Sequence, residues 1–469
     1  MTTNLSRGRD TQRWLILLSV VGCLFAELSI VQAQDGAGLG TPTATDSPTT
    51  NGTLTPAPTQ LATVSGSAKA YTSECYQEIS YKNYDLAIAD CTQAIQLAPQ
   101  YESPYVDRAW AYESKGNYDL AIADCNDAIS LDPNDAVPYV NRGVAYQDLG
   151  DSGHALADYN QAIKLNPNYA LAYIDRGSVF YEKGDYAHAL ADYNQAIRLN
   201  PKYVLAYNNR GNVYHKQGNN VLALADYNQA INISPNDPTA YYLRGILFQS
   251  QGHDDLAMQD YTHAIAVDPT YAPPYFNRGV LNDHLRQFTL AMADLDQYIL
   301  LDPKYAPAFN VRGQVFHQQG QDDLAVDDYS QAIALDPRFT DAYWNRGIAY
   351  KNLHKSDLAL ADYNQAIELS PQLVDLYVDR GAIYSDLGKT ELALADFNQA
   401  IVLDPKYANT FREFGLFYDA QHRYADALGK YLQYVKLAGK QADSTVVDRI
   451  RELQVILSAA PPATLTATP

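Results

Sequence analysis

The 469-residue chain is poor in basic residues, cysteine and tryptophan, and it contains no catalytic motif. It has 34 Lys+Arg against 54 Asp+Glu, so its formal net charge is −20 at pH 7. No basic run interrupts this acidity, which argues against a nucleic-acid partner held by phosphate contacts. The sequence has no G-x-S-x-G, H-E-x-x-H, Walker or C-x-x-C pattern, and its nine histidines are scattered. We therefore expect no enzymatic activity, no metal site and no cofactor.

A long apolar run lies near the N-terminus, from Trp14 to Ala26, and follows three arginines. This order is typical of a secretory signal peptide. Val31 and Ala33 supply the small residues of a cleavage site, so we predict cleavage after Ala33, which removes residues 1–33. Two alternatives remain. In the first, the sequence around Cys23 is a bacterial lipobox, which it resembles, and Cys23 carries lipid. In the second, the apolar run is not cleaved and stays as a membrane anchor. All three predict an exported protein, whether secreted, periplasmic or at the cell surface, that meets a membrane only through this segment.

Two further segments are rich in Thr, Pro, Ser and Ala and poor in large apolar residues. They are residues 34–67, which also contain several glycines, and residues 460–469. Such segments bury too little apolar area to offset the entropy lost on ordering. We predict that the first is a disordered linker and the second a disordered tail.

Between these segments, prolines recur at intervals of 34 residues. They are Pro99, Pro133, Pro167, Pro201, Pro235, Pro269, Pro303, Pro337, Pro371 and Pro405. This period is the signature of tandem helix–turn–helix repeats. Eleven repeats fill residues 68–441 without a gap: 68–101, 102–135, 136–169, 170–203, 204–237, 238–271, 272–305, 306–339, 340–373, 374–407 and 408–441. An amphipathic pattern over residues 442–459 then predicts a capping helix.

Within each repeat, numbered 1 to 34, the same positions carry the same kinds of residue. Position 4 is aromatic, position 8 is mostly Gly, positions 20 and 27 are mostly Ala, and position 24 is mostly Tyr. Positions 4, 8 and 11 share one face of a first helix, and positions 20, 24 and 27 share one face of a second. Gly at position 15 ends the first helix, and Pro at position 32 stops the second.

This pattern resembles that of the tetratricopeptide repeat (TPR) family over residues 68–441. The family has a large residue at position 4, small residues at positions 8, 20 and 27, aromatics at 11 and 24, and Pro at 32. The chain departs from it by placing Arg at position 7. The resemblance implies an all-α fold, a right-handed α-solenoid of helix–turn–helix repeats with a C-terminal capping helix.

Two charged positions also repeat: Arg at position 7 in repeats two to ten, and Asp at position 23 in repeats one to ten. Identical charges in every repeat discriminate nothing along a ligand, so we expect ion pairs between helices rather than a binding ladder. The pattern leaves open whether each pair lies within one repeat or between neighbours. Either arrangement leaves one aspartate over, Asp90 or Asp396.

Three of the four cysteines occupy core positions of the first two repeats. Cys91 and Cys125 lie one repeat apart, which is beyond disulfide reach. Cys75 and Cys91 face each other inside repeat one. In an exported protein they predict a disulfide that stabilises the repeat without a preceding neighbour; buried free thiols are the alternative.

The resemblance also implies a concave groove lined by the first helices, with positions 2, 5, 6, 9, 12 and 13 facing a peptide. In the central repeats these positions carry amides and aromatics, which suit recognition of an extended segment. The candidate peptide-binding residues are Asn208, Asn209, Asn212, His215, Tyr242, Phe276, Asn277, Asn310, Trp344, Asn345 and Lys351. The alternative is that these positions form a solvent-exposed surface without a binding role, whose residues vary by neutral drift.

The sequence therefore predicts an exported, non-enzymatic scaffold that binds a peptide or partner protein in the groove of a TPR superhelix. The alternative is an accessory subunit of a cell-envelope or secretion enzyme complex, in which the partner supplies catalysis.

Repeat seven, residues 272–305, departs most from the pattern. It has Asn282 at position 11 and Leu295 at position 24, where aromatics are usual. Two lost aromatics weaken packing, and the stability of a solenoid depends on neighbouring interfaces. We predict a flexible joint at this repeat.

Overall fold

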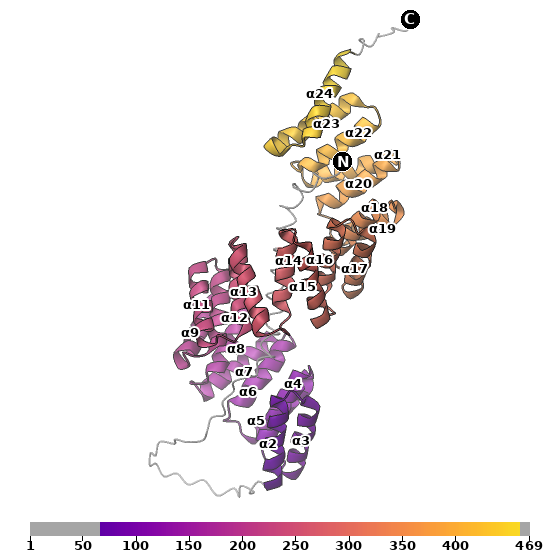
Figure 1. The fold of residues 1–469 in the computed structure, drawn as a ribbon. Coiled ribbons are helices and arrows are strands. Elements are labelled where there is room, and N and C mark those ends of the chain that lie inside the picture. The colour runs from indigo at the N-terminus through magenta and orange to yellow at the C-terminus, as the bar shows by residue number, and fades with distance from the viewer. Residues whose placement is uncertain (1–65, 460–469) are drawn as a thin grey trace. The chain divides into compact units, whose positions relative to one another are not determined.

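The computed structural model describes residues 66–459, and every regular element in this range is a helix (Figure 1). The chain divides into two compact units, residues 1–253 and 254–469. We call them the N-terminal unit and the C-terminal unit. The division falls between the two helices of repeat six. The predicted signal peptide and most of the predicted linker lie outside the described residues, as does the predicted tail.

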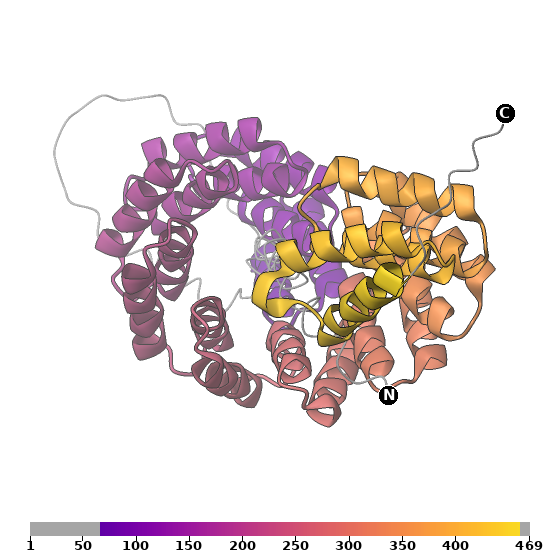
Figure 2. The ribbon, with the colours of Figure 1, turned by 90° about the horizontal axis from the view of Figure 1, so that it is seen from above.

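Each repeat of the N-terminal unit contributes a first helix, with an even number, and a second helix, with an odd number. The helices are α2 (Gly66–Ser80), α3 (Tyr84–Leu97), α4 (Ser103–Ser114), α5 (Tyr118–Leu131), α6 (Val137–Asp148), α7 (Ser152–Leu165), α8 (Ala170–Glu182), α9 (Tyr186–Leu199), α10 (Val204–Lys216), α11 (Asn220–Ile233) and α12 (Pro238–Ser250). The two helices of one repeat pack on each other, and each second helix packs on the next first helix (Figure 2).

The C-terminal unit continues the same order. Its helices are α13 (Asp254–Val267), α14 (Pro273–His284), α15 (Phe288–Leu301), α16 (Ala306–Gln318), α17 (Asp322–Leu335), α18 (Thr340–Asn352), α19 (Ser356–Leu369), α20 (Val374–Asp386), α21 (Thr390–Leu403), α22 (Ala408–Ala420), α23 (Tyr424–Ala438) and α24 (Ser444–Ala459), with a short 3₁₀ helix at Gly439–Gln441. Helix α24 buries Ile450 and Leu453 against α23, where Tyr431 and Tyr434 lie. It covers the apolar side of the last repeat and is the predicted capping helix.

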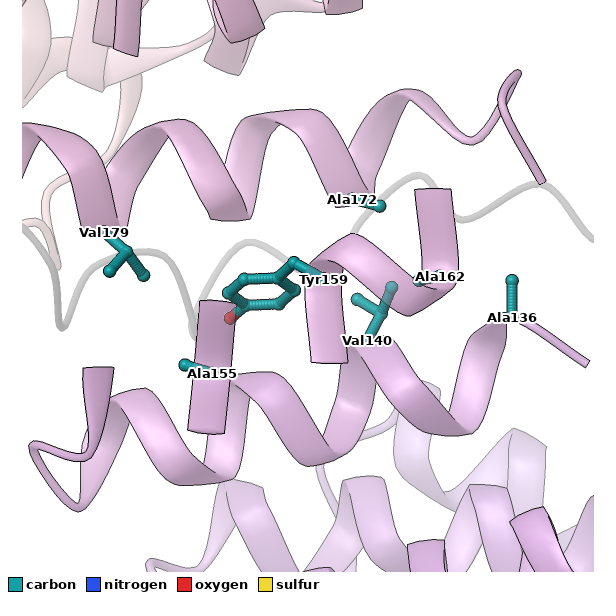
Figure 3. Packing of buried hydrophobic residues seen from close by; sticks show 7 residues of the cluster. All are labelled: Ala136, Val140, Ala155, Tyr159, Ala162, Ala172 and Val179. Atoms are coloured by element: carbon teal, nitrogen blue, oxygen red, sulfur yellow. The ribbon is translucent and has the colours of Figure 1, made fainter. Parts of the chain in front are cut away.

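A tyrosine at position 24 fills the crossing of the two helices in most repeats. In repeat three, Tyr159 is fully buried and lies among Val140, Ala155 and Ala172 (Figure 3). A Cβ atom at Gly143 would lie 2.6 Å from the Tyr159 ring, closer than atoms pack in protein interiors. Glycine at position 8 therefore allows the first helix to approach the ring.

Position 15 adopts a left-handed backbone in all the repeats where the turn is described. Glycine occupies it in seven repeats, with φ from +68° to +79°. A Lys, Arg or His adopts the same conformation in four repeats, at Lys82, Arg286, His354 and His422. The turn therefore follows from the helix packing, because L residues adopt it at a cost of about 1–2 kcal/mol.

The Arg–Asp pairs lie within repeats, which answers the question that the sequence left open. In eight repeats, Nε and Nη2 of the arginine donate to both carboxylate oxygens of the aspartate at 2.6–2.9 Å. These pairs are Arg108–Asp124, Arg142–Asp158, Arg176–Asp192, Arg210–Asp226, Arg278–Asp294, Arg312–Asp328, Arg346–Asp362 and Arg380–Asp396. Asp90 is the aspartate left over, and its repeat carries Glu74 at position 7.

These eight arginines and Arg244, which holds position 7 of repeat six, also join each repeat to the one before it. Nη1 of each arginine donates, at 2.5–3.0 Å, to a short side chain at position 25 of the preceding repeat. The acceptors are Thr92, Asn126, Asn160, Asn194, Asn228, Thr262, Asp296, Ser330 and Asn364. Each guanidinium further lies 5.5–6.0 Å from the centre of the position-4 ring. One planar group thus contacts three helices, a geometry that lysine does not reproduce.

A disulfide joins Cys75 and Cys91, whose Cα atoms are 5.4 Å apart. These residues hold positions 8 and 24 of repeat one, the crossing that Gly143 and Tyr159 occupy in repeat three. Cys125 is a buried free thiol, and burial raises its pKa. The covalent bond therefore replaces the glycine–tyrosine contact in the first repeat.

Candidate functional site

The first helices of successive repeats contact one another directly. In the N-terminal unit α4 contacts α6, α6 contacts α8, α8 contacts α10, and α10 contacts α12. In the C-terminal unit α14 contacts α16, α16 contacts α18, and α20 contacts α22. We call the exposed sides of these two layers the first-helix faces, one in each unit. The predicted site residues divide between them.

The N-terminal unit holds five predicted site residues: Asn208, Asn209, Asn212, His215 and Tyr242. Asn212 is buried and accepts a hydrogen bond from the Tyr227 hydroxyl at 2.7 Å. Asn209 is half-buried, and its Nδ2 lies 3.4 Å from Ser178 Oγ of the preceding repeat. These two amides therefore already bind protein groups.

The other three residues of this set differ in exposure. Asn208 and Tyr242 are 2% and 1% exposed, so a ligand does not reach them in this conformation. His215 is half-buried, with Nδ1 3.3 Å from Asn220 Oδ1, and burial lowers its pKa. At neutral pH His215 is therefore a neutral hydrogen-bonding group.

The C-terminal unit holds the other six: Phe276, Asn277, Asn310, Trp344, Asn345 and Lys351. Nδ2 of Asn345 donates to Oδ1 of Asn310 at 3.0 Å, and Trp344 Nε1 donates to Oδ2 of Asp379 at 2.9 Å. In both bonds, position 5 of one repeat meets position 6 of the next. These two positions form a seam between neighbouring first helices.

Two further members of this set are also enclosed. Phe276 is 1% exposed, and its ring centre lies 5.4 Å from those of Tyr298 and Tyr305. Asn277 is 2% exposed, with Nδ2 3.4 Å from the Tyr261 hydroxyl. Lys351 keeps part of its surface exposed.

The structure therefore separates the candidates by accessibility. Asn209, His215 and Lys351 retain accessible surface on the first-helix faces, whereas the other eight are buried, seven of them at the seam positions 5 and 6 and Asn212 at position 9. The repeat pattern gave no sign of this, because positions 5, 6, 9 and 12 were all expected to face the groove. Their role in peptide binding stays a prediction.

Sequence reasoning missed a row of carboxylates at positions 6, 12 and 13 of repeats two to four. We call this row the acidic strip: Asp107, Glu113, Asp148, Asp175 and Glu182. No lysine or arginine occupies these positions in the three repeats, and this was the available signal.

The carboxyls of the strip act on one another. Burial, and next the neighbouring Asp148, raise the pKa of Glu113 to about 7. Burial raises the pKa of Asp107 to about 7, and burial together with Glu182 raises that of Asp148. Burial and mutual repulsion both disfavour the charged carboxylates.

Asp175, on α8, is the most enclosed carboxyl of the strip. It is 8% exposed, and within residues 66–459 it has no hydrogen-bond or ion-pair partner. Burial, and next Glu113, raise its pKa to about 8. An enclosed carboxyl without a donor is uncommon, because such groups lose their hydration without replacement.

Among residues 66–459, His, Cys, Asp and Glu side chains form no group of three or more that could hold a metal ion. Nor does any helix in that range combine the length and the apolar character needed to span a membrane. The segment that carries the predicted signal peptide lies outside these residues.

Helix pairs that repeat every 34 residues, with an aromatic against a glycine at each crossing, define an α-helical repeat protein. Sequence models described as "TPR repeat" match residues 110–150, 177–218, 211–252 and 313–353. Models described as "Tetratricopeptide repeat" match residues 136–169, 238–271, 340–373 and 374–407. Together they cover more than half of the chain, which belongs to the tetratricopeptide repeat family. No curated protein matches the sequence.

Several solved structures are similar in fold. Yeast Tom70 is 16% identical, with a match over 83% of this chain and 96% of that chain and a TM-score of 0.39. Cut9–Hcn1 of the APC/C is 13% identical over 82% and 96%, with a TM-score of 0.45. YrrB, described as a TPR protein with an unusual peptide-binding site, is 21% identical over 39% and 95%, with a TM-score of 0.32. At these identities the likeness concerns the fold alone.

TPR folds bind peptides or proteins, and proteins of this family are generally non-enzymatic scaffolds. The fold of this chain is consistent with a protein–protein interaction scaffold.

Proposed function

We propose that this protein is an exported scaffold that binds a peptide or a partner protein on its first-helix faces. One observation carries the proposal: the repeated positions form the packing, whereas the accessible positions that vary lie on the first helices. Positions 4, 7, 8, 23, 24 and 25 are occupied by the arginine, aromatic and glycine contacts. Positions 12 and 13 change from repeat to repeat, as recognition of one partner requires.

The outer surface of the second helices is uniform by comparison. Leucine recurs at position 19 and is 41–57% exposed, at Leu86, Leu120, Leu222, Leu256, Leu290, Leu324, Leu358 and Leu392. A row of identical side chains does not distinguish one register of a partner from another. This surface is therefore a weaker candidate for specific recognition.

Export is supported by the disulfide of repeat one. Disulfides persist in oxidising compartments and are rare in the cytosol. The order of residues from Arg7 to Ala33 is a second, independent argument, made from sequence alone. Mass spectrometry of the native protein should find Gln34 at the N-terminus, or lipid on Cys23. An intact Met1 in a cytosolic fraction would contradict export.

Site-specific photocrosslinking tests the binding face. A photoreactive amino acid placed at Asn209 on α10, or at Lys351 on α18, should capture a partner protein in the native host. The matched controls are Leu222 on α11 and Leu358 on α19, which are exposed on the second helices of the same repeats. Capture from the second helices alone would refute the proposal. The identity of the captured protein would also show whether the chain serves an enzyme complex.

A further inference from the structure

The acidic strip has no cation of its own. The arginines of its three repeats, Arg108, Arg142 and Arg176, are held in bidentate pairs with aspartates of the second helices. The charged groups that act on Asp175 and Glu113 are other carboxylates. The strip is therefore a partly enclosed acidic surface that the repeat packing leaves without a cation.

Asp379 in repeat ten shows what an enclosed carboxyl at position 6 requires. It is 9% exposed and accepts a hydrogen bond from Trp344 Nε1, which belongs to position 5 of the preceding repeat. Asp175 holds the same position in repeat four and is 8% exposed. The residue at position 5 before it is Val140, which has no side-chain donor. Asp175 thus has the burial of a paired carboxyl but not the pair.

Other groups around Asp175 do not supply the missing donor. Helix α8 packs against α6, α7, α9 and α10. Its own Arg176 is bound to Asp192, Arg142 of α6 is bound to Asp158, and the Arg210 of α10 is bound to Asp226. The polar Gln147 donates to Glu182 at 2.8 Å. No side chain among residues 66–459 donates a hydrogen bond to Asp175, so a ligand can supply this donor.

We propose that the acidic strip binds a lysine- or arginine-bearing segment of the partner, with Asp175 and Glu113 as its principal acceptors. This inference rests on the proposed function and names the chemistry of the partner at that face. A cationic side chain supplies both the charge that the strip lacks and the donor that Asp175 lacks. A peptide also spans the three first helices that carry the strip. A compact metal site is less suitable, because no three of these ligands are grouped as a metal requires.

Binding of a simple cationic peptide tests the inference. The probe is a fluorescein-labelled peptide of alternating lysine and glycine, measured by fluorescence anisotropy with the full chain at about 0.15 M salt. A peptide of alternating glutamate and glycine controls for the label. We expect saturable binding of the lysine peptide and none of the glutamate peptide.

Charge-matched variants separate the strip from the general acidity of the chain. The strip variant is Glu113→Gln/Asp175→Asn, which keeps the side-chain shapes and removes the two carboxyls that a cationic ligand would hold in their charged form. The control variant is Asp119→Asn/Asp127→Asn, which removes two exposed charges from α5. The strip variant should weaken binding by about tenfold or more, whereas the control should change it by less than about twofold.

The outcomes are distinct. Equal weakening in the two variants would mean non-specific attraction and would overturn the inference. Wild-type protein that binds no lysine peptide would also overturn it, while photocrosslinks at Asn209 would still support the proposed function. Stabilisation of the wild type, but not of the strip variant, by calcium alone would replace the peptide site with a metal site. The strip variant should fold, because each carboxyl is replaced by a neutral amide of nearly the same shape, and its circular dichroism checks this.

Discussion

Repeats four and seven solve the same packing problem with different residues. In repeat four, the Tyr193 ring at position 24 fills the crossing, and Ala196 at position 27 is fully buried. In repeat seven, Leu295 at position 24 is fully buried, and the aromatic is Tyr298 at position 27. Tyr298 lies in a cluster with Phe276 and Tyr305. The aromatic volume has moved by about one helical turn along the second helix.

The arginine contact is kept in both repeats, with one addition. In repeat seven, Arg278 binds Asp294 as Arg176 binds Asp192 in repeat four. Asn282, at the position of a lost aromatic, donates a third hydrogen bond to Asp294, to Oδ2 at 3.1 Å. The comparison shows that the polar pair is the invariant part of the repeat, whereas the apolar filling can be redistributed.

The largest expected effect comes from removing the aspartate in each repeat. Asp294→Ala removes the carboxylate that accepts from both Arg278 and Asn282. Asp192→Ala removes a carboxylate that accepts from Arg176 alone. Loss of one partner of a partly buried ion pair costs about 3–5 kcal/mol, so both repeats should open more easily, repeat seven more than repeat four. Hydrogen exchange of the amides in each repeat measures this. Equal effects would show that Asn282 contributes nothing.

A second test gives repeat seven the packing of repeat four, by moving its aromatic residue from position 27 to position 24. Tyr298→Ala should cost about 3 kcal/mol of stability in repeat seven, because it leaves a cavity beside Phe276 and Tyr305. Adding Leu295→Tyr restores the pattern of repeat four and should recover more than half of the loss. Leu295→Tyr alone should destabilise the repeat by overpacking. No recovery in the double variant would mean that the two arrangements are not interchangeable.

A pH dependence should appear in repeat four and not in repeat seven. The folded pKa of Asp175 is raised to about 8, well above that of an unfolded aspartate, whereas repeat seven has Asn277 at this position. The folded state therefore binds the extra proton, and stability falls as pH rises from about 4 to 8. Between pH 5 and 8 the loss should be at most about 4 kcal/mol, at about 1.4 kcal/mol per pH unit, with Glu113 adding to it.

Asp175→Asn should remove most of this dependence from repeat four. Hydrogen exchange corrected for the intrinsic effect of pH on amide exchange is the measurement. If the stability of repeat four depends on pH as steeply in the variant as in the wild type, the dependence belongs to other carboxyls of the strip.

Smaller differences are expected at the glycine of each crossing. A Cβ at Gly177 would lie 2.8 Å from the Tyr193 ring, whereas one at Gly279 would lie 3.1 Å from Leu295 Cγ. Gly177→Ala should destabilise by about 1 kcal/mol, because overpacking of a rigid ring exceeds the gain in helix propensity. Gly279→Ala should be close to neutral, because leucine can shift. Urea unfolding of the two variants decides the sign.

The smallest expected difference concerns the flexible joint that the sequence predicted at repeat seven. That prediction assumed packing lost at Asn282 and Leu295, and this premise is wrong because Tyr298 restores the aromatic volume. Amides of repeat seven should exchange at rates close to those of repeat eight. Markedly faster exchange in repeat seven would restore the flexible joint.

The proposed recognition surface was only partly predictable. The sequence pointed to the first helices and to amides there, but most of those amides bind neighbouring repeats, as Asn310 and Asn345 do. Asp175 went unnoticed because its chemistry depends on its surroundings. Its counterpart Asp379 has the same residue type and position, yet Trp344 satisfies it. Only a structure shows which of two identical residues lacks a partner.

The sequence by itself determined the eleven repeats, their helix pairs, the capping helix and the pairing of repeated charges. These follow from a fixed period, because each repeat packs between neighbours of the same kind and the repeated residues return to equivalent places in that packing. The tertiary structure alone decided that Arg108 and its equivalents bind within a repeat to aspartate and across repeats to position 25. It also decided which carboxyls remain unpaired. The physical reason is that hydrogen bonding and burial depend on distances between separate helices, and a 34-residue period does not specify those distances.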